Sequence, residues 1–309
     1  MTSSKKVTFK SKGINLVGVL YLPSDFDSTK KYNAIVMTPP FPQVKDQAIS
    51  NYAPRFAEKG YVALVFDYNT KGESDSYQEG FRNDDDMPRK WEDLRNAISF
   101  IKSQPFVNRL FGVGFCGGGN IMSSTIITDL RVEAFASVSA MLATDMIQFA
   151  DKEAFRQMVT AANEARQKMF ETGKPVEADY FGYTDPDYLM KNTDLSPAQI
   201  EGYDYYGTKR GGTERYPNYG NVLLSNVNES GLLNLGEQYA DKMLQPYCAI
   251  VGSEAETAIC TKLFYDKVTS KKEYHEIDGA SHVDLYDKVE FIDQVVDKVV
   301  AFFHKHNRD

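Results

Sequence analysis

A cysteine flanked by glycines constrains this chain more than any other feature of its sequence. In the segment Gly114–Gly118, glycine stands two residues before and two residues after Cys116. An apolar stretch typical of a strand, Leu110–Phe115, leads into the cysteine, and a helical pattern, Asn120–Thr128, follows it. A tight turn from strand to helix leaves no room for side chains on either side of its central residue. The pattern therefore predicts a sharp turn that lifts the Cys116 sulfur clear of the sheet.

Two other interpretations of this turn are weaker. A glycine-rich turn could bind phosphate, but no Lys followed by Ser or Thr comes after the glycines, and the spacing of dinucleotide-binding loops does not fit. A buried structural cysteine is the second alternative, and it would need no glycine on both sides. We therefore interpret Cys116 as the nucleophile of a strained nucleophile elbow. The N-terminus of the following helix is expected to favour its thiolate.

Short apolar strands alternate with amphipathic helices over most of the chain, which predicts an α/β fold with a mainly parallel central sheet flanked by helices. An antiparallel pair around Lys12-Gly13 opens the pattern. The expected strands are Val7–Lys10, Ile14–Tyr21, Ala34–Thr38, Val62–Phe66, Leu110–Phe115, Val132–Val138, Tyr247–Val251 and Glu273–Ile277. The expected helices are Asp46–Lys59, Trp91–Ser103, Asn120–Thr128, Thr257–Val268 and Val289–His304. The core is therefore expected to comprise residues 1–140 and 246–309.

The alternation stops between residues 141 and 245. One long helix, Asp151–Thr172, is expected first, and a segment rich in Gly, Pro, Asp and Tyr follows it. This stretch is too long for an ordinary connection, and such excursions are usually lids or binding loops. A second independent domain is the alternative, but the short apolar segments favour a helical cap, residues 141–245, that packs on the core. The tyrosines of Tyr203–Tyr219 are expected either to line a pocket under this cap or to lie on its surface.

His282 is the candidate base among the four histidines. A thiol with a pKa of ~8.5 needs a neighbouring base to be fully active near pH 7. His282 lies in the loop after the last expected strand, where the α/β-hydrolase fold carries its catalytic histidine. His304 and His306 lie in a polar tail, and His275 lies inside a strand.

The acidic partner of His282 is expected after the preceding strand, where Glu254 and Glu256 both lie. A carboxylate there would hold the tautomer of the imidazole and stabilise the imidazolium. Asp278 and Asp284 lie too close to His282 along the chain and are interpreted as loop-forming. The spacing thus indicates a Cys-His-Glu triad and leaves the choice between the two glutamates open.

These segments together resemble the dienelactone-hydrolase-like and peptidase-like branch of the α/β-hydrolase superfamily, which includes fungal polyketide transferases. The similarity covers nearly the whole chain, and Ile277–Asp287 is its most specific segment. The other matching segments are Gly13–Pro23, Phe66–Ser74, Trp91–Ile98, the elbow and Tyr203–Gly211. The resemblance implies an α/β-hydrolase fold with acyl-transfer chemistry. It also implies Glu256 as the acid, because relatives carry theirs at that position.

One segment departs from the family pattern. After Ala34–Thr38, relatives often carry a His-Pro-Gly-Gly-Gly stretch that helps to build the oxyanion hole, whereas this chain has Pro39–Gln43 with three prolines. Proline has no N–H to donate. The oxyanion donors are therefore expected to be the amides of Gly117, the residue after the nucleophile, and Phe41. The loss of one such donor typically costs about 3 kcal/mol of transition-state stabilisation.

Composition excludes several other classes of protein. The net charge of −8 argues against nucleic-acid binding. Three cysteines are too few and too scattered for a disulfide framework or a zinc cluster, and the acidic run Asp84–Asp86 is interpreted as solvated. No apolar run approaches the ~20 residues of a membrane span. No apolar stretch follows the polar Met1–Lys6 as in a signal peptide, so a cytoplasmic location is expected.

The predicted function is hydrolysis of an ester, thioester or lactone through an acyl-enzyme on Cys116, with His282 as base and Glu256 as acid. The expected partner is a small-molecule acyl substrate, with no cofactor or metal, and a homodimer is left open. An acyltransferase that passes the acyl group to an alcohol or amine is the first alternative. The second is a ligand-binding protein that keeps the fold without the chemistry.

Overall fold

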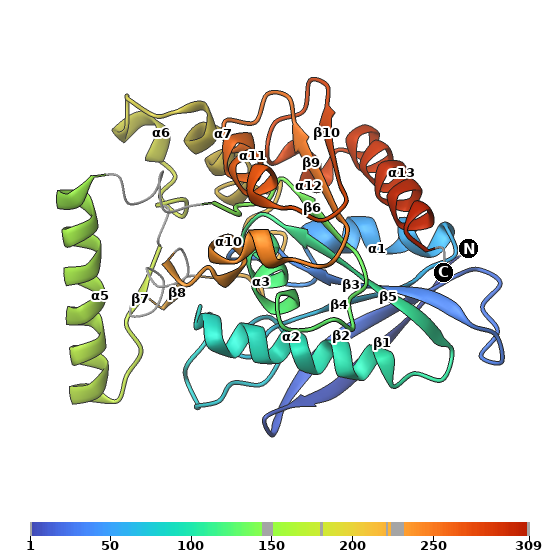
Figure 1. Ribbon diagram of the computed structural model, residues 1–309. Coiled ribbons are helices and arrows are strands. Elements are labelled where there is room, and N and C mark those ends of the chain that lie inside the picture. Colours follow the sequence, from blue (N-terminus) through green and yellow to red (C-terminus); the bar gives the residue numbers. More distant parts are fainter. Residues whose placement is uncertain (1, 144–150, 180–181, 221, 224–231, 308–309) are drawn as a thin grey trace.

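A computed structural model describes residues 2–143, 151–179, 182–220, 222–223 and 232–307 (Figure 1). Its centre is an eight-stranded sheet in the order β1-β2-β4-β3-β5-β6-β9-β10. The strands are β1 (Ser3–Ser11), β2 (Ile14–Leu22), β3 (Tyr32–Thr38), β4 (Val62–Phe66), β5 (Val107–Phe115), β6 (Phe135–Val138), β9 (Tyr247–Gly252) and β10 (Lys272–Ile277). The pairs β1–β2 and β2–β4 are antiparallel, and all other neighbours are parallel. The mainly parallel sheet expected from the sequence is confirmed.

Helices cover both faces of the sheet, so the inner strands are buried on both sides. The flanking helices are α1 (Ala48–Glu58), α2 (Met87–Lys102), α3 (Gly117–Ile126), α11 (Ala258–Lys267) and α13 (Val289–Lys305). Along β3, Val36 packs into the core on the side of α2 and α3, while Ile35 packs into the core on the side of α1 and α13. This alternation is the two-residue period of a strand, and burial of both faces explains its continuous apolar sequence.

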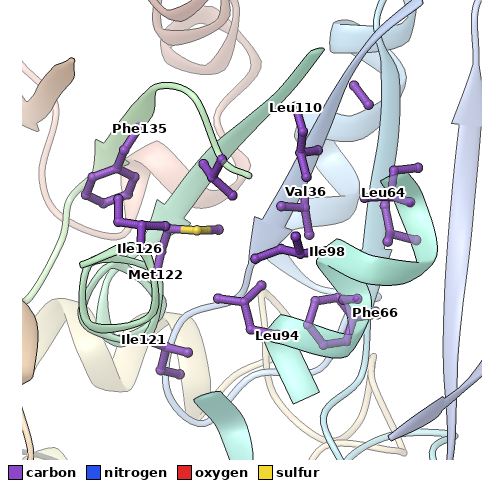
Figure 2. Close-up of a cluster of buried hydrophobic side chains, with 14 of the residues drawn as sticks. Val36, Leu64, Phe66, Leu94, Ile98, Leu110, Ile121, Met122, Ile126 and Phe135 are labelled. Atoms are coloured by element: carbon purple, nitrogen blue, oxygen red, sulfur yellow. The ribbon is translucent and has the colours of Figure 1, made fainter. Parts of the chain in front are cut away.

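One of these two cores lies between the middle strands and helices α2 and α3 (Figure 2). Leu94 and Ile98 of α2 point toward Val36 and Phe66 of the sheet, and Met122 of α3 lies beside β5 and β6. The end of β5 therefore leads directly into α3, and the apolar face of α3 is packed into this core. Packing of this kind fixes where the residue between β5 and α3 sits.

Between β6 and β9 the chain leaves the sheet. The elements there are α5 (Lys152–Thr172), β7 (Glu177–Ala178), α6 (Tyr188–Lys191), α7 (Pro197–Tyr206), β8 (Val222–Leu223), α10 (Leu235–Gln238) and the 3₁₀ turn η1 (Ala240–Lys242). The long helix expected over Asp151–Thr172 is present and stands apart from the sheet at the left of Figure 1. The segment is not wholly helical, because β7 and β8 form a small antiparallel sheet.

The end of this segment belongs to the packing of the core. The Gly236 N–H donates to Ser124 Oγ of α3 at 3.0 Å, and Ala240 and Met243 are buried in the same apolar cluster as α2 and α3. The proposed cap is therefore the described part of residues 141–245 that precedes Asn234. None of the helices among the described residues combines the length and hydropathy that crossing a membrane requires.

Candidate functional site

Cys116 lies between β5 and α3 in a backbone conformation that residues with a side chain rarely adopt. Its φ is 47° and its ψ is −122°, and a positive φ is tolerated only where the surrounding structure holds the chain. The Cys116 N–H donates to the Val138 carbonyl at 3.2 Å, and the Met141 N–H donates to the Cys116 carbonyl at 3.0 Å. The end of β6 and the residues after it therefore hold the strained turn in place.

The glycines around Cys116 lie where a side chain would collide with backbone. A Cβ on Gly118 would come within 2.4 Å of the Thr38 carbonyl oxygen. A Cβ on Gly114 would come within 2.7 Å of the Gly119 Cα. Both positions thus require glycine because the backbone of the elbow approaches β3 and the first turn of α3 too closely for any Cβ.

Two backbone amides converge on the Cys116 side chain. The N–H groups of Gly117 and Phe41 both hydrogen-bond to it. The Phe41 carbonyl accepts a hydrogen bond from Tyr206 Oη at 3.3 Å, and Gln43 Nε2 donates to that same hydroxyl at 3.1 Å. The structure therefore brings together the two donors expected from the sequence, and Tyr206 braces the loop that carries Phe41.

His282 reaches this site through an intermediary. It follows β10 and lies two residues before the short helix α12 (Asp284–Asp287), and its Nε2 hydrogen-bonds to Tyr286 Oη at 2.7 Å. The Tyr286 hydroxyl also hydrogen-bonds to the Cys116 side chain. On its other side, His282 Nδ1 hydrogen-bonds to Thr257 Oγ1. Sequence reasoning missed both Thr257 and Tyr286, although the spacing of four between His282 and Tyr286 places residues on one face of a helical turn.

The structure differs from the sequence prediction at the acidic residue. Glu256 is exposed, and its Oε2 accepts a hydrogen bond at 3.0 Å from the Ala198 N–H, in the first turn of α7. The unpaired amides of a helix N-terminus attract a carboxylate, which explains why this side chain turns outward. Glu254 is also exposed and accepts a hydrogen bond from the serine before it. Neither glutamate is brought to His282, whose Nδ1 is occupied by Thr257.

Burial keeps both Cys116 and His282 uncharged. Removal from water raises the pKa of the Cys116 thiol, although hydrogen bonds from Tyr286, Gly117 and Phe41 oppose this rise. Burial also lowers the pKa of His282 to about 4. Desolvation of Cys116 therefore outweighs the stabilisation of its thiolate that is expected from the N-terminus of α3. Near pH 7 the site holds a neutral thiol and a neutral imidazole.

The cap contributes side chains to the surroundings of Cys116. Tyr205 and Tyr206 of α7 lie in a small apolar cluster that includes the site. The cluster consists of Ala48, Tyr205, Val283 and Tyr286, with Cys116 and Tyr206 packed against it. Tyr206 also stacks on Tyr219, with ring centroids 5.8 Å apart. The tyrosine-rich segment is expected from the sequence either to line a pocket or to lie on the surface. Tyr205 and Tyr206 face the site.

The segment that begins with α7 also binds the loop that carries His282. Arg210 pairs with Asp284 at 3.0 Å and with Asp287 at 2.7 Å. Glu201 accepts hydrogen bonds from the backbone N–H groups of His282 and of the next residue. A single short stretch of the cap therefore contacts the Phe41 loop on one side and the His282 loop on the other.

The sequence predicts that the acidic run Asp84–Asp86 is solvated. The structure differs, because Asp85 is fully buried. Asp85 pairs with Lys71 at 2.9 Å and also with Lys90, and Asp86 caps the N-terminus of α2. Over the ranges that the structure describes, His, Cys, Asp and Glu side chains do not gather in threes as a metal site would require.

Comparison with known proteins places the chain in a family. A profile of the dienelactone hydrolase family matches residues 16–169. PA2218 of Pseudomonas aeruginosa is 30% identical over 312 residues, which cover 98% of this chain and 80% of PA2218. YcjY of Escherichia coli is 27% identical over 315 residues, which cover 98% of this chain and 99% of YcjY. The polyketide transferase grgF of a Penicillium species is 31% identical over 119 residues, covering 38% of this chain and 40% of that protein.

Solved structures agree on the fold. The crystal structure of PA2218 matches with a TM-score of 0.83 at 28% identity, covering 99% of this chain and 94% of the other. The crystal structure of the alpha/beta hydrolase GrgF from Penicillium matches with a TM-score of 0.74 at 21% identity, covering 99% of each chain. The fold expected from the elbow and the strand pattern is thus confirmed, and the chain belongs to the dienelactone hydrolase family of α/β-hydrolases, enzymes that act on acyl bonds.

Proposed function

We propose that this enzyme hydrolyses an ester, thioester or lactone, with Cys116 as nucleophile and His282 as base. The observation that carries the proposal is the convergence of the Gly117 and Phe41 amides on the Cys116 side chain. Two N–H donors at a nucleophile are the arrangement that stabilises the oxyanion of a tetrahedral intermediate. The match to the dienelactone hydrolase family supports the same class of reaction.

The proposed reaction has two stages. In acylation, the thiol proton of Cys116 passes to His282 while the sulfur bonds to the acyl carbon, and the amides of Gly117 and Phe41 hold the resulting oxyanion. The oxyanion collapses, and the leaving group takes the proton from His282. In deacylation, His282 accepts a proton from water, the water oxygen attacks the acyl carbon, and Cys116 leaves and regains its proton as the acid is released.

Acyl transfer to an alcohol or amine is a second candidate function. It is favoured by the similarity to grgF, which is named a polyketide transferase. The chemistry differs only in the nucleophile that replaces water in the second stage. Product analysis with an activated acyl ester and a series of added alcohols or amines separates the two, because a transferase forms the new ester or amide at the expense of the free acid.

The first prediction tests the nucleophile. Replacement of Cys116 by Ala removes the only group that forms the acyl-enzyme, so hydrolysis of p-nitrophenyl acetate should fall to the level of the uncatalysed reaction. Cys248→Ala, at a buried cysteine of β9, serves as the control and should keep the wild-type rate. A Cys116→Ala protein that is folded and as active as the wild type would contradict the mechanism. If the wild type is as inactive as Cys116→Ala on a panel of esters, the result would instead favour a ligand-binding protein that does not catalyse a reaction.

The second prediction concerns pH. Only the neutral imidazole accepts a proton, and burial lowers the pKa of His282 to about 4. We expect kcat/KM for the ester to stay level from about pH 7 to about pH 5 and to fall only below that, whereas an ordinary histidine titrates near pH ~6.5. The unfolded chain binds the proton first as pH falls, so stability also declines below the ordinary histidine pKa. Circular dichroism at each pH therefore has to accompany the rates, and an acid limb near pH 6.5 in folded protein would contradict the proposal.

The third prediction concerns the partner of His282 Nδ1. We propose Thr257 in this role in place of Glu256, because Thr257 makes the contact and Glu256 binds the N-terminus of α7. Thr257→Val should lower kcat by about 10-fold or more through loss of the group that orients the imidazole. Glu256→Gln should change kcat by less than about threefold, as should the matched control Glu254→Gln, since both side chains are exposed. A large loss in Glu256→Gln alone would restore the Cys-His-Glu assignment.

The fourth prediction tests whether the cap positions the His282 loop. Arg210→Ala removes two ion pairs to α12 and should lower kcat/KM by roughly 10-fold, because Asp287 loses its ion pair and Asp284 keeps only the one with Lys288. Arg210→Lys should recover part of this loss. The neighbouring Lys209, whose side chain is 81% exposed, pairs with an exposed glutamate, so Lys209→Ala should be nearly silent. Equal rates for Arg210→Ala and Lys209→Ala would exclude a positioning role.

A further inference from the structure

The Tyr286 hydroxyl joins the two groups that the proposed reaction uses. It hydrogen-bonds to the Cys116 side chain and, at 2.7 Å, to His282 Nε2. The Cys116 thiol and the His282 imidazole are therefore connected through the Tyr286 hydroxyl. In the reaction described above, that phenol lies on the path of the proton that must leave Cys116.

The ring of Tyr286 is held firmly, so the hydroxyl is aimed rather than free to turn. The side chain is only 1% exposed. Its ring packs edge-to-face against Tyr205, with centroids 5.2 Å apart, and against His282, with centroids 5.4 Å apart. The Tyr286 carbonyl accepts a hydrogen bond from Asn51 Nδ2 at 2.8 Å, which ties α12 to α1. Apolar packing would hold a phenylalanine here equally well, so the hydroxyl needs a separate explanation.

We propose that Tyr286 is a catalytic residue that relays the thiol proton from Cys116 to His282, an inference that rests on the proposed function. In the resting site, the thiol donates to Tyr286 Oη, the Tyr286 O–H donates to His282 Nε2, and His282 Nδ1–H donates to Thr257 Oγ1. As the sulfur bonds to the acyl carbon, its proton moves to Tyr286 Oη and the tyrosine proton moves to Nε2.

The relay keeps every atom in balance. The carbonyl π electrons move to the oxygen that Gly117 and Phe41 hold, the sulfur gains the acyl carbon and loses its proton, and His282 becomes an imidazolium. Tyr286 loses one proton and gains another, so it is a neutral phenol before and after the step. Burial and the nearby thiol raise the pKa of Tyr286 well above its ordinary value, which agrees with a group that passes protons on without becoming a phenolate.

The same geometry predicts an effect on the thiol itself. When Cys116 is a thiolate, the Tyr286 O–H donates to the sulfur and stabilises its charge, as the hydrogen bond that lowers the pKa of Cys116 indicates. Loss of the hydroxyl should therefore make the thiolate harder to form, independently of any substrate. This gives a second measurement that a tyrosine with a purely structural role would leave unchanged.

The fifth prediction compares Tyr286→Phe with Tyr61→Phe. Tyr61 is also a buried tyrosine, 2% exposed, and its hydroxyl has no hydrogen-bond partner among the described residues. The pre-steady-state rate of acylation by p-nitrophenyl acetate should fall about 10²- to 10³-fold in Tyr286→Phe and should stay at the wild-type value in Tyr61→Phe. Both variants should keep the wild-type circular dichroism spectrum and unfold within a few degrees of each other.

The pH dependence of Cys116 alkylation by iodoacetamide, followed by mass spectrometry of the peptide that contains it, completes the test. Its midpoint should move to higher pH in Tyr286→Phe and stay in place in Tyr61→Phe. Unchanged acylation together with an unchanged midpoint, or faster acylation in Tyr286→Phe, would overturn the relay. Wild-type protein that acylates no faster than Cys116→Ala would instead refute the proposed function, and the alkylation midpoint would then decide whether Tyr286 acts on the thiol.

Discussion

The site depends on one close backbone contact, between the elbow and the end of β3. The Gly118 backbone lies so near the Thr38 carbonyl that no Cβ fits between them, and Thr38 Oγ1 donates to the Gly118 carbonyl at 2.8 Å. β3 and β5 are neighbours in the sheet, so this contact presses the loop after β3 against the first turn of α3. The amides of Phe41 and Gly117 reach the same sulfur because of it. A strained Cys116 and an amide from a distant loop are therefore two results of a single packing requirement.

The cap adds a second level of organisation. Tyr206 donates a hydrogen bond to the Phe41 carbonyl, while Arg210 forms ion pairs with the two carboxylates of α12. The Phe41 loop leads into α1, and Asn51 and Tyr52 of α1 donate hydrogen bonds to carbonyls of α12, the helix that follows His282. A short stretch of the proposed cap contacts both loops as well, so the positions of Cys116 and His282 depend on the core and on the insertion together.

Much of the fold was predictable because burial on both faces leaves continuous apolar strands, and Val62–Phe66 has the same bounds in sequence and structure. The starts of helices were harder to predict. α2 begins at Met87 rather than Trp91, because Asp86 caps it from within an acidic run, and α3 begins among glycines, which have low helix propensity. At the site, the positions of Cys116, His282, Gly117 and Phe41 followed from the order of strands and loops. Thr257 and Tyr286 did not, because only packing decides which side chain of a loop turns inward.

The neutral state of Cys116 has a consequence for the durability of the enzyme. Peroxide and similar oxidants attack thiolates, and they convert exposed, low-pKa cysteines to sulfenic acid and then to irreversible products. A buried cysteine whose pKa is raised by desolvation presents very little thiolate between turnovers. In the proposed mechanism, the sulfur loses its proton only when an acyl carbon is ready to receive it. The same burial is therefore expected to slow the oxidation of Cys116 in the absence of substrate.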